Sequence, residues 1–314
     1  MTTKRFGSMG WTPERLGSLT GKTYVITGAN TGAGFEATRA FLSSGASVVM
    51  MNRNADKSKA AMATLKQEFG GDADVTFVRL DLAELDSVRD AAADVLDKVP
   101  RIDALLCNAA IAQVAEREIT VDGFESQLGV NHFGHFLLCG LLFERVEGSG
   151  GRIVVVGSNA YKMGLKRIQF EDLNFDKNYT AWNSYAQSKL AQMMFAYELQ
   201  RRVLAAGKNV EVHVCHPGAS RTNLLMDTAS SFNKIVWSIL SRIIAQSAEK
   251  GAWPEVMCAT EEGLEPERYF GPTRRSQTVG PIDECPLEEL ALNQEAAEKL
   301  WTLSEQQTSL SWSP

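Results

Sequence analysis

Short apolar runs alternate with longer segments of helical spacing along most of this chain, and this alternation constrains its fold most strongly. The apolar runs occupy residues 24–27, 47–51, 75–78, 104–107, 152–156 and 210–214. Helical spacing marks the intervening residues 34–42, 57–69, 85–99 and 124–142. Several runs are apolar on both faces, as parallel strands must be when helices cover both sides of a sheet. The pattern predicts an α/β fold, a Rossmann-like, doubly wound parallel sheet of about seven strands with helices on both faces.

The alternation continues without a linker or repeat that would divide the chain into domains. We therefore expect residues 1–20 to be a polar N-terminal lead-in and residues 21–314 to form a single domain. Residues 268–270 are a candidate last strand, and residues 294–303 a candidate final helix. The region at about 220–260 contains an apolar, amphipathic stretch at 232–244, from which we expect a lid over an apolar substrate, with plain core as the alternative.

Composition and charge exclude several classes of function. The 32 Lys and Arg residues are outnumbered by 38 Asp and Glu residues, for a net charge of −6, so the chain lacks the basic balance of a nucleic-acid-binding protein. No apolar stretch has the length of a membrane span, and the first residues lack the apolar core of a signal peptide. The five cysteines form no Cys-x-x-Cys pair, which favours reduced, buried thiols. We expect a cytoplasmic protein, and the sequence leaves open whether residues 232–244 touch a membrane surface.

A glycine cluster follows the first predicted strand directly. Small residues at this junction permit a tight turn and let a pyrophosphate approach backbone N–H groups at the start of the next helix. The residues expected to bind a dinucleotide here are Gly28, Asn30, Thr31, Gly32, Ala33 and Gly34.

The end of the second strand predicts which dinucleotide binds. An acidic residue at this position would hold the ribose 2′-hydroxyl of NAD, whereas an arginine accommodates a 2′-phosphate. The strand ends with Asn52 and Arg53 and has no acid, which favours NADP(H) over NAD(H). The alternative is that Arg53 is only a solvated loop cation. Asp81, followed by Leu82 after the third strand, is a candidate for the adenine amino group or for a helix N-cap.

Tyr185 and Lys189 are four residues apart in a helical pattern, so they share one helical face. A free phenol is a poor base at neutral pH, but a nearby ammonium favours the phenolate and would make Tyr185 a general acid or base. Ser158 ends the fifth strand, where its hydroxyl can donate to a substrate carbonyl. Asn131 lies in the middle of a predicted helix, where Asn is mildly unfavourable unless it has a task.

These motifs together resemble the short-chain dehydrogenase/reductase family over about residues 18–305. The glycine turn at 27–34 matches the family's TGxxxGxG motif, and residues 107–110 match its NNAG motif. The resemblance implies catalytic roles for Asn131, Ser158, Tyr185 and Lys189. It further implies that residues near the adenosine and residues along the nicotinamide contact the cofactor. These residues are Asn108, Ala109, Ala110, Tyr185, Lys189, Pro217, Gly218 and Thr222. We expect a small lipophilic alcohol or carbonyl compound as the substrate. The expected assembly is a homodimer or a homotetramer.

Within the family, the segments at 107–110, 122–125 and 131–136 resemble the retinol dehydrogenase and protochlorophyllide reductase branch. Ser158 and Tyr185 are separated as in the retinol dehydrogenase-like pattern, whereas light-dependent protochlorophyllide reductases carry a longer insertion there. Those photoenzymes also have a cysteine just after the Pro-Gly pair, where this chain has Ala219. Both differences disfavour the photoenzyme.

Other interpretations of the polar residues are weaker. His132 and His135 are three residues apart on one predicted helix but lack accompanying metal ligands, so no metal site is expected. His216, before the Pro-Gly pair, is either structural or substrate-lining. Ser158 lacks the Gly-x-Ser-x-Gly elbow of a serine hydrolase. A non-catalytic NADP(H)-sensing regulator remains an alternative, although Ser, Tyr and Lys are all present.

Overall fold

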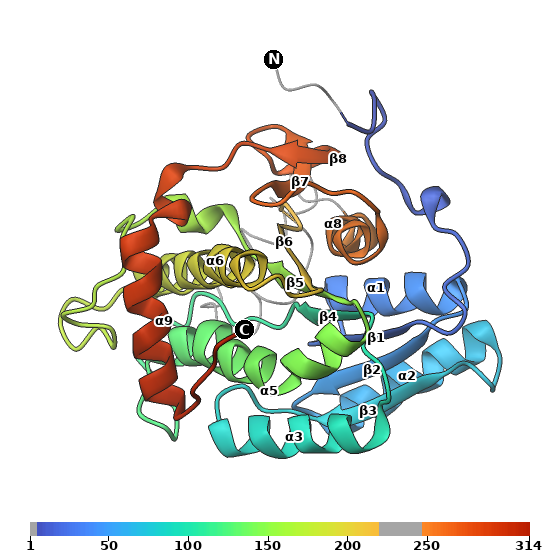
Figure 1. The fold of residues 1–314 in the computed structure, drawn as a ribbon, viewed down its shortest axis with the longest axis horizontal. Helices are drawn as coiled ribbons and strands as arrows, with labels where there is room; N and C mark the ends of the chain where they lie inside the picture. Colours follow the sequence, from blue (N-terminus) through green and yellow to red (C-terminus); the bar gives the residue numbers. More distant parts are fainter. Residues whose placement is uncertain (1–4, 220–246) are drawn as a thin grey trace.

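A computed structural model describes residues 5–219 and 247–314. Its eight-stranded sheet has the order β3-β2-β1-β4-β5-β6-β7-β8 (Figure 1). The strands are β1 (Thr23–Thr27), β2 (Ser47–Asn52), β3 (Val75–Arg79), β4 (Ala104–Cys107), β5 (Arg152–Val156), β6 (Glu211–Cys215), β7 (Tyr269–Arg274) and β8 (Val279–Cys285). Every pair from β3 to β7 is parallel, whereas β7 and β8 are antiparallel. The doubly wound α/β fold is therefore confirmed, with one strand more than the sequence predicts.

Helices cover both faces of the sheet, as the apolar strands require (Figure 1). One face carries α1 (Gly32–Ser43), α2 (Ala55–Phe69) and α8 (Ala248–Thr260). The other face carries α3 (Leu85–Lys98), α5 (Gly134–Gly148), α6 (Ala181–Ala205) and α9 (Gln294–Thr308). These positions explain why the apolar runs do not alternate with polar residues.

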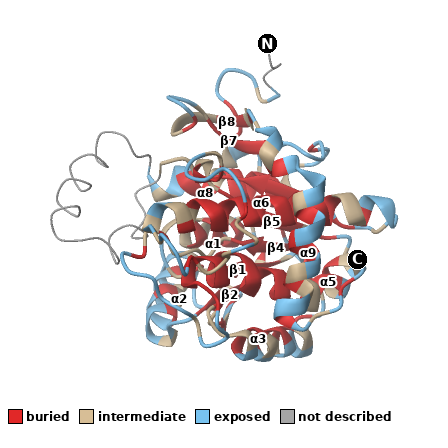
Figure 2. Cartoon of the chain, turned by 90° about the vertical axis from the view of Figure 1, so that its left-hand side faces the viewer, coloured by how far each residue is buried: buried red, intermediate tan, exposed pale blue. Residues whose placement is uncertain are grey.

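Strand β1 illustrates how successive side chains supply two separate cores. Val25 packs on the face of α3, α5 and α6, whereas Tyr24 and Ile26 pack on the opposite face with α1. The Tyr24 and Phe41 rings are stacked with their centroids 3.9 Å apart. Figure 2 shows the buried residues concentrated in the strands and on the helix surfaces that face them.

The helix predicted at 124–142 is not continuous in the structure. It consists of α4 (Ser126–Leu128), a π-helical turn (Gly129–Phe133) and α5. A β-carbon added at Gly134 would lie 2.5 Å from the carbonyl oxygen of Leu82, so only glycine permits this close packing at the start of α5. The π-helical turn contains Asn131, and such turns occur frequently at functional sites.

The last third of the chain corrects two expectations. The candidate strand at 268–270 overlaps the start of β7, and the hairpin partner β8 was not predicted. Trp11 of the N-terminal lead-in donates from its backbone to the carbonyl oxygen of Ile282 in β8, so this part of the lead-in lies against the last strand. Helix α8 buries residues such as Val256 and Cys258 in the core, so residues 248–260 do not belong to a lid. The rest of the predicted lid, including 232–244, lies outside the described residues.

Two further expectations concern the membrane and the thiols. Among the described residues, no helix is long and apolar enough to cross a membrane. All five cysteines are free and buried, as predicted. Cys107 and Cys139 lie close together with their sulfur atoms 3.4 Å apart.

Candidate active site

The predicted site residues gather at one edge of the sheet because the carboxyl ends of parallel strands lie on the same side. The glycine turn follows β1, Asn52 ends β2 and Arg53 follows it, and Asp81 and Leu82 follow β3. Asn108, Ala109 and Ala110 follow β4, Ser158 follows β5, and Pro217 and Gly218 follow β6. Thr222 lies outside the described residues. The sheet order reverses between β1 and β4, which is where open α/β sheets bind their ligands.

The glycine turn is held in a form that excludes side chains. Gly28 has φ = +70°, and a β-carbon there would lie 2.9 Å from the Ala109 Cα atom. A β-carbon at Gly34 would lie only 2.4 Å from the Asn108 Nδ2 atom. That amide donates to the carbonyl oxygens of Thr27 (2.8 Å) and Gly28 (3.2 Å), which links β4 to the turn.

The start of α1 is open to an anion. Thr31 occupies the N-cap position but makes no side-chain hydrogen bond to the first helical N–H groups. Backbone N–H groups without a cap attract negative charge at a helix N-terminus. The turn and the helix start therefore fit the pyrophosphate of a dinucleotide.

The end of β2 offers polar atoms for the remainder of such a cofactor. The side chain of Asn52 is buried, and within the described part of the chain neither its Nδ2 nor its Oδ1 atom has a hydrogen-bond partner. A buried amide without partners is costly unless a ligand supplies them. Arg53 is exposed at the same edge, with no acidic residue beside it in the strand end. Both residues lie at the position expected for the 2′-phosphate.

Asp81 and Leu82 form the turn that leads into α3. The Asp81 Oδ1 atom accepts a hydrogen bond from the Ala83 N–H (3.0 Å), and the N-cap of α3 is Glu84. The predicted alternative of a helix N-cap at Asp81 is therefore wrong. Leu82 is buried against Gly134.

Ser158 and Tyr185 meet at this edge. Ser158 follows β5 and Tyr185 lies near the start of α6, and both side chains are partly exposed. Burial raises the pKa of the Tyr185 phenol above its ordinary value, and a hydrogen bond from the Ser158 hydroxyl opposes this increase. The net pKa is therefore raised in this structure, and the lowering by Lys189 that the sequence pattern predicts stays a prediction.

Lys189 is almost fully buried one helical turn after Tyr185. Its Nζ atom donates to the Val156 carbonyl oxygen (3.0 Å) at the end of β5 and to the Gln192 Oε1 atom (2.8 Å). Burial lowers the pKa of this ammonium to about 7, and the Cys215 thiol opposes the decrease. Lys189 is therefore poised to change its charge near neutral pH.

Asn131 links the loop that follows β4 to helix α6. Its Oδ1 accepts from the Ile111 N–H, and its Nδ2 donates to the Ile111 carbonyl oxygen and to the Ser188 hydroxyl, each at 2.9 Å. Ser188 lies between Tyr185 and Lys189 in sequence and donates to the Tyr185 carbonyl oxygen (2.8 Å). The two amide donors of Asn131 are thus both used, one on the Ile111 backbone and one on the Ser188 hydroxyl.

The histidines are structural in this fold. His132 contacts the Ser304 hydroxyl of α9 at 2.8 Å, whereas His135 contacts the Thr27 hydroxyl of β1 at 3.0 Å, so the two rings point to different elements. Burial lowers the pKa of His132 to about 3 and that of His135 to about 4. His216 is buried and stacks on Tyr269 with ring centroids 4.7 Å apart. Residues 5–219 and 247–314 contain no cluster of three metal-ligating side chains.

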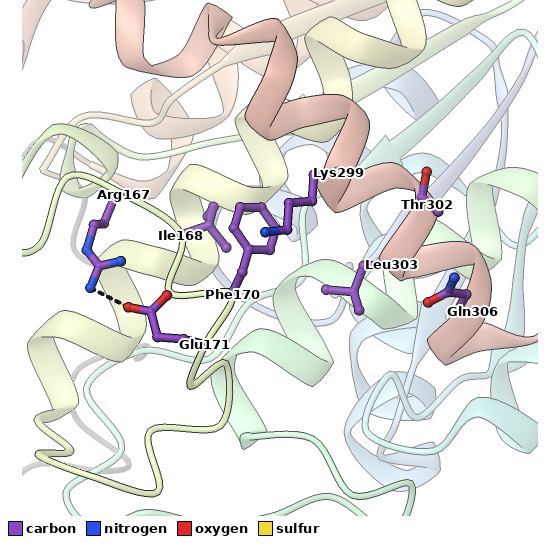
Figure 3. A pocket seen from close by; sticks show the side chains of 8 residues that line it. All are labelled: Arg167, Ile168, Phe170, Glu171, Lys299, Thr302, Leu303 and Gln306. Atoms are coloured by element: carbon purple, nitrogen blue, oxygen red, sulfur yellow. Dashed lines mark hydrogen bonds and ion pairs between the residues drawn. The ribbon is translucent and has the colours of Figure 1, made fainter.

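A separate hollow of about 660 Å³ lies between α9 and the loop before α6 (Figure 3). Arg167 forms an ion pair with Glu171 on one side, and the Lys299 ammonium lies 4.4 Å from the Phe170 ring centroid. None of the predicted site residues lines this hollow. It is therefore distinct from the sheet edge that carries Tyr185.

Sequence reasoning missed two polar residues that the structure brings to the site. Gln192 contacts Lys189, and Ser188 joins Asn131 to α6. Gln192 was detectable, because position i+3 from Lys189 lies on the same helical face. Ser188 carried no separate signal, since its partner comes from 57 residues earlier in the chain.

The fold and the site together define a class of protein: a dinucleotide-dependent oxidoreductase with an α/β sheet. Comparisons with known proteins agree. A family model described as short chain dehydrogenase matches residues 22–170. Retinol dehydrogenase 14 of Mus musculus is 37% identical over 310 residues, which cover 92% of this chain and 86% of the relative. Retinol dehydrogenase 12 of Homo sapiens is 36% identical over 297 residues, covering 94% and 88%.

The chain belongs to the short-chain dehydrogenase/reductase family, whose members are NAD(P)-dependent oxidoreductases that act on CH–OH groups. Its resemblance to the retinol dehydrogenase-like branch is confirmed by these relatives. A crystal structure of an uncharacterized protein from Mycobacterium paratuberculosis has a TM-score of 0.79 and 37% identity, covering 96% of this chain and 99% of that one. A short-chain type dehydrogenase/reductase from Mycobacterium marinum, 21% identical with a TM-score of 0.62, shares the fold over 79% of this chain and 92% of its own.

Proposed function

We propose that this protein interconverts a lipophilic alcohol and its aldehyde or ketone with NADP(H), using Ser158, Tyr185 and Lys189. The observation that carries this proposal is the position of Ser158 after β5 and of Tyr185 near the start of α6, close enough for the Ser158 side chain to lower the pKa of the phenol, at the sheet edge that also carries the glycine turn. A hydroxyl and a phenol side by side can bind one carbonyl oxygen together.

The proposed mechanism assigns proton transfer to Tyr185. NADP(H), when bound at the glycine turn, supplies or accepts the hydride at the substrate carbon. In reduction, Tyr185 gives its phenolic proton to the carbonyl oxygen, and Ser158 donates a hydrogen bond to the same oxygen. The raised pKa of Tyr185 supports this direction, because the phenol keeps its proton at neutral pH. In oxidation, the phenolate form of Tyr185 receives the proton of the alcohol on the same oxygen atom.

The remaining polar residues support this exchange. The Lys189 ammonium contributes positive charge one turn from Tyr185, which favours the phenolate whenever that group loses its proton. Asn131 positions the loop at Ile111 and, through Ser188, the helix that carries both groups. The return of a proton through a water near Asn131 is inferred from the family resemblance alone.

We infer a preference for NADP(H) from the end of β2. Asn52 supplies two unpartnered polar atoms, and Arg53 supplies an exposed guanidinium suited to a phosphate. Titration of the wild-type protein with NADPH and NADH tests this inference. Tighter binding of NADH would refute it.

The lipophilic substrate class is supported by exposed apolar side chains beside Tyr185. Trp182 is 38% exposed, and its ring centroid lies 6.3 Å from that of Tyr185. Met163 and Leu165 are also exposed and flank Gly164, where a β-carbon would contact Ala186 of α6 at 3.0 Å. Relatives named retinol dehydrogenase support an alcohol of this kind. Turnover confined to small, polar sugars in a panel of retinoid, steroid, aliphatic and aromatic carbonyl compounds would contradict this assignment.

Replacement of Tyr185 by Phe tests the mechanism directly. The Tyr185→Phe variant keeps the ring but loses the transferable proton, so turnover should fall at least about 10²–10⁴-fold while NADPH binding persists. Tyr179→Phe is a matched control, because the Tyr179 hydroxyl donates to the Val114 carbonyl oxygen (2.7 Å), away from Ser158 and Lys189.

Three outcomes would change the assignment. Near-wild-type turnover in Tyr185→Phe would show that another group transfers the proton. Turnover that requires illumination would favour the photoenzyme alternative. Tight NADPH binding without turnover of any compound in the panel would favour the non-catalytic regulator.

A further inference from the structure

Gln192 contacts the ammonium group of Lys189 in the interior of the protein. The Lys189 Nζ atom lies 2.8 Å from Gln192 Oε1 and 3.0 Å from the Val156 carbonyl oxygen. Lys189 is 3% exposed and Gln192 is 1% exposed. The ammonium is therefore held between its own helix and the end of the strand that leads to Ser158.

The chemistry of lysine determines the orientation of the Gln192 amide. An ammonium has three donors and no acceptor, so only the Oε1 end of the amide can face it. The Nε2 end is buried and has no hydrogen-bond partner among the described residues. An unpartnered buried donor disfavours folding, so an apolar side chain would pack better at this position. The contribution of Gln192 is thus its acceptor atom rather than its packing.

We propose that Gln192 is a positioning residue, which fixes the Lys189 ammonium at the carboxyl end of β5 and favours its charged form. This inference rests on the proposed function, in which the charge of Lys189 supports Tyr185. Two of the three lysine donors are directed to Val156 and Gln192. Among the described residues no hydrogen bond engages the third donor, which leaves it for the phenol or for a ligand.

The surroundings of Lys189 provide little other stabilisation for a positive charge. The titratable groups that face it are Tyr185 on its own helix, Cys215 of β6 and His135 of α5. Burial raises the pKa of the Tyr185 phenol and of the Cys215 thiol, and lowers that of His135, so all three are uncharged near neutral pH. The acceptors of Val156 and Gln192 are therefore the hydrogen-bond partners that favour the ammonium over the neutral amine, beside the influence of Cys215.

The test compares Gln192→Met with Gln192→Glu through the pH dependence of kcat/KM, measured with NADPH and a carbonyl substrate from the panel. Methionine removes the acceptor and the unpartnered donor together, so this variant should fold. The basic limb of the profile, where Lys189 loses its charge, should move to lower pH by about one unit or more, as expected for one lost hydrogen bond to a charged group. Glutamate retains an acceptor and adds negative charge, so its limb should move to higher pH.

Gln200→Met is the matched control on the same helix. Gln200 is also a buried amide, and it bonds to the backbone of Val212 (2.9 Å) and Glu267 (2.8 Å) rather than to Lys189. Its replacement should lower the thermal stability without moving the pH profile. A purely structural role of Gln192 predicts the same behaviour for Gln192→Met.

Lys189→Met separates failure of this inference from failure of the proposed function. Wild-type turnover in Lys189→Met would refute the role of Lys189 itself. If Lys189→Met is impaired but the basic limb of Gln192→Met coincides with that of the wild type, the positioning role of Gln192 is overturned. Opposite shifts in the methionine and glutamate variants support it. If Gln192→Glu does not fold, the basic limb of Gln192→Met is compared with that of Gln200→Met. A limb at lower pH in Gln192→Met supports the positioning role, and coinciding limbs overturn it.

Discussion

Glu255 in α8 is a buried carboxyl group whose replacement should stabilise the protein at neutral pH. It is 1% exposed, and across residues 5–219 and 247–314 neither carboxyl oxygen has a hydrogen-bond partner. Burial raises the pKa of Glu255 from its ordinary 4.5 to about 8. The folded protein therefore keeps this group protonated at pH 7, whereas the unfolded chain ionises it.

The pKa difference determines both the sign and the size of the effect. Because the folded-state pKa is the higher one, wild-type stability decreases as pH rises from 4.5 to about 8 and then levels off. At pH 7, the unfolded chain is about 2.5 pH units above its pKa, and each unit corresponds to about 1.4 kcal/mol. The cost to the free energy of unfolding is thus about 3 kcal/mol. Glu255→Gln keeps the shape of the side chain and removes this dependence.

Urea unfolding of the wild type and Glu255→Gln at several pH values between about 5 and 8.5 measures the effect. The stability advantage of the variant should be small at the acidic end and grow to about 3 kcal/mol near pH 7. Glu198→Gln is an opposite control, because buried Glu198 accepts hydrogen bonds from Arg201 and Arg202 and should lose stability when neutralised. Parallel stability curves for the wild type and Glu255→Gln would refute the reasoning.

Three further changes test the cofactor and substrate sites. Arg53→Ala should weaken NADPH binding about 10-fold or more and leave NADH binding unchanged, as measured by fluorescence titration. Equal losses of affinity for both cofactors would exclude a contact between Arg53 and the 2′-phosphate. Gly34→Ala would place a β-carbon 2.4 Å from Asn108 Nδ2, so both the melting temperature and the NADPH affinity should decrease, and wild-type affinity would contradict a rigid turn. Trp182→Ser should raise KM for large lipophilic carbonyl compounds by about 10-fold but not for small ones, and a uniform change would argue against an apolar contact.

Much of the fold could be predicted because its strands are covered on both faces. Val25 and Ile26 enter different cores, so both must be apolar, and an unbroken apolar run follows directly. Strand β8 gave no such signal. It lies at the sheet edge and includes Pro281 and Asp283, residues that an edge strand tolerates more easily than a central one. The π-helical turn at Asn131 was equally hidden, because no local pattern in residues 129–133 distinguishes it from a continuous α-helix.

The amino-acid sequence by itself determined the features that depend on neighbouring residues. The small residues of the glycine turn permit close backbone approach, and the spacing of Tyr185 and Lys189 places them on one helical face, whatever surrounds them. Only the tertiary structure decided how these groups ionise and what they contact. Burial and partners from distant segments raise the pKa of Tyr185, lower that of Lys189 and engage both ends of the Asn131 amide. Desolvation and hydrogen bonding depend on the three-dimensional surroundings of a group, and no local pattern in the chain specifies them.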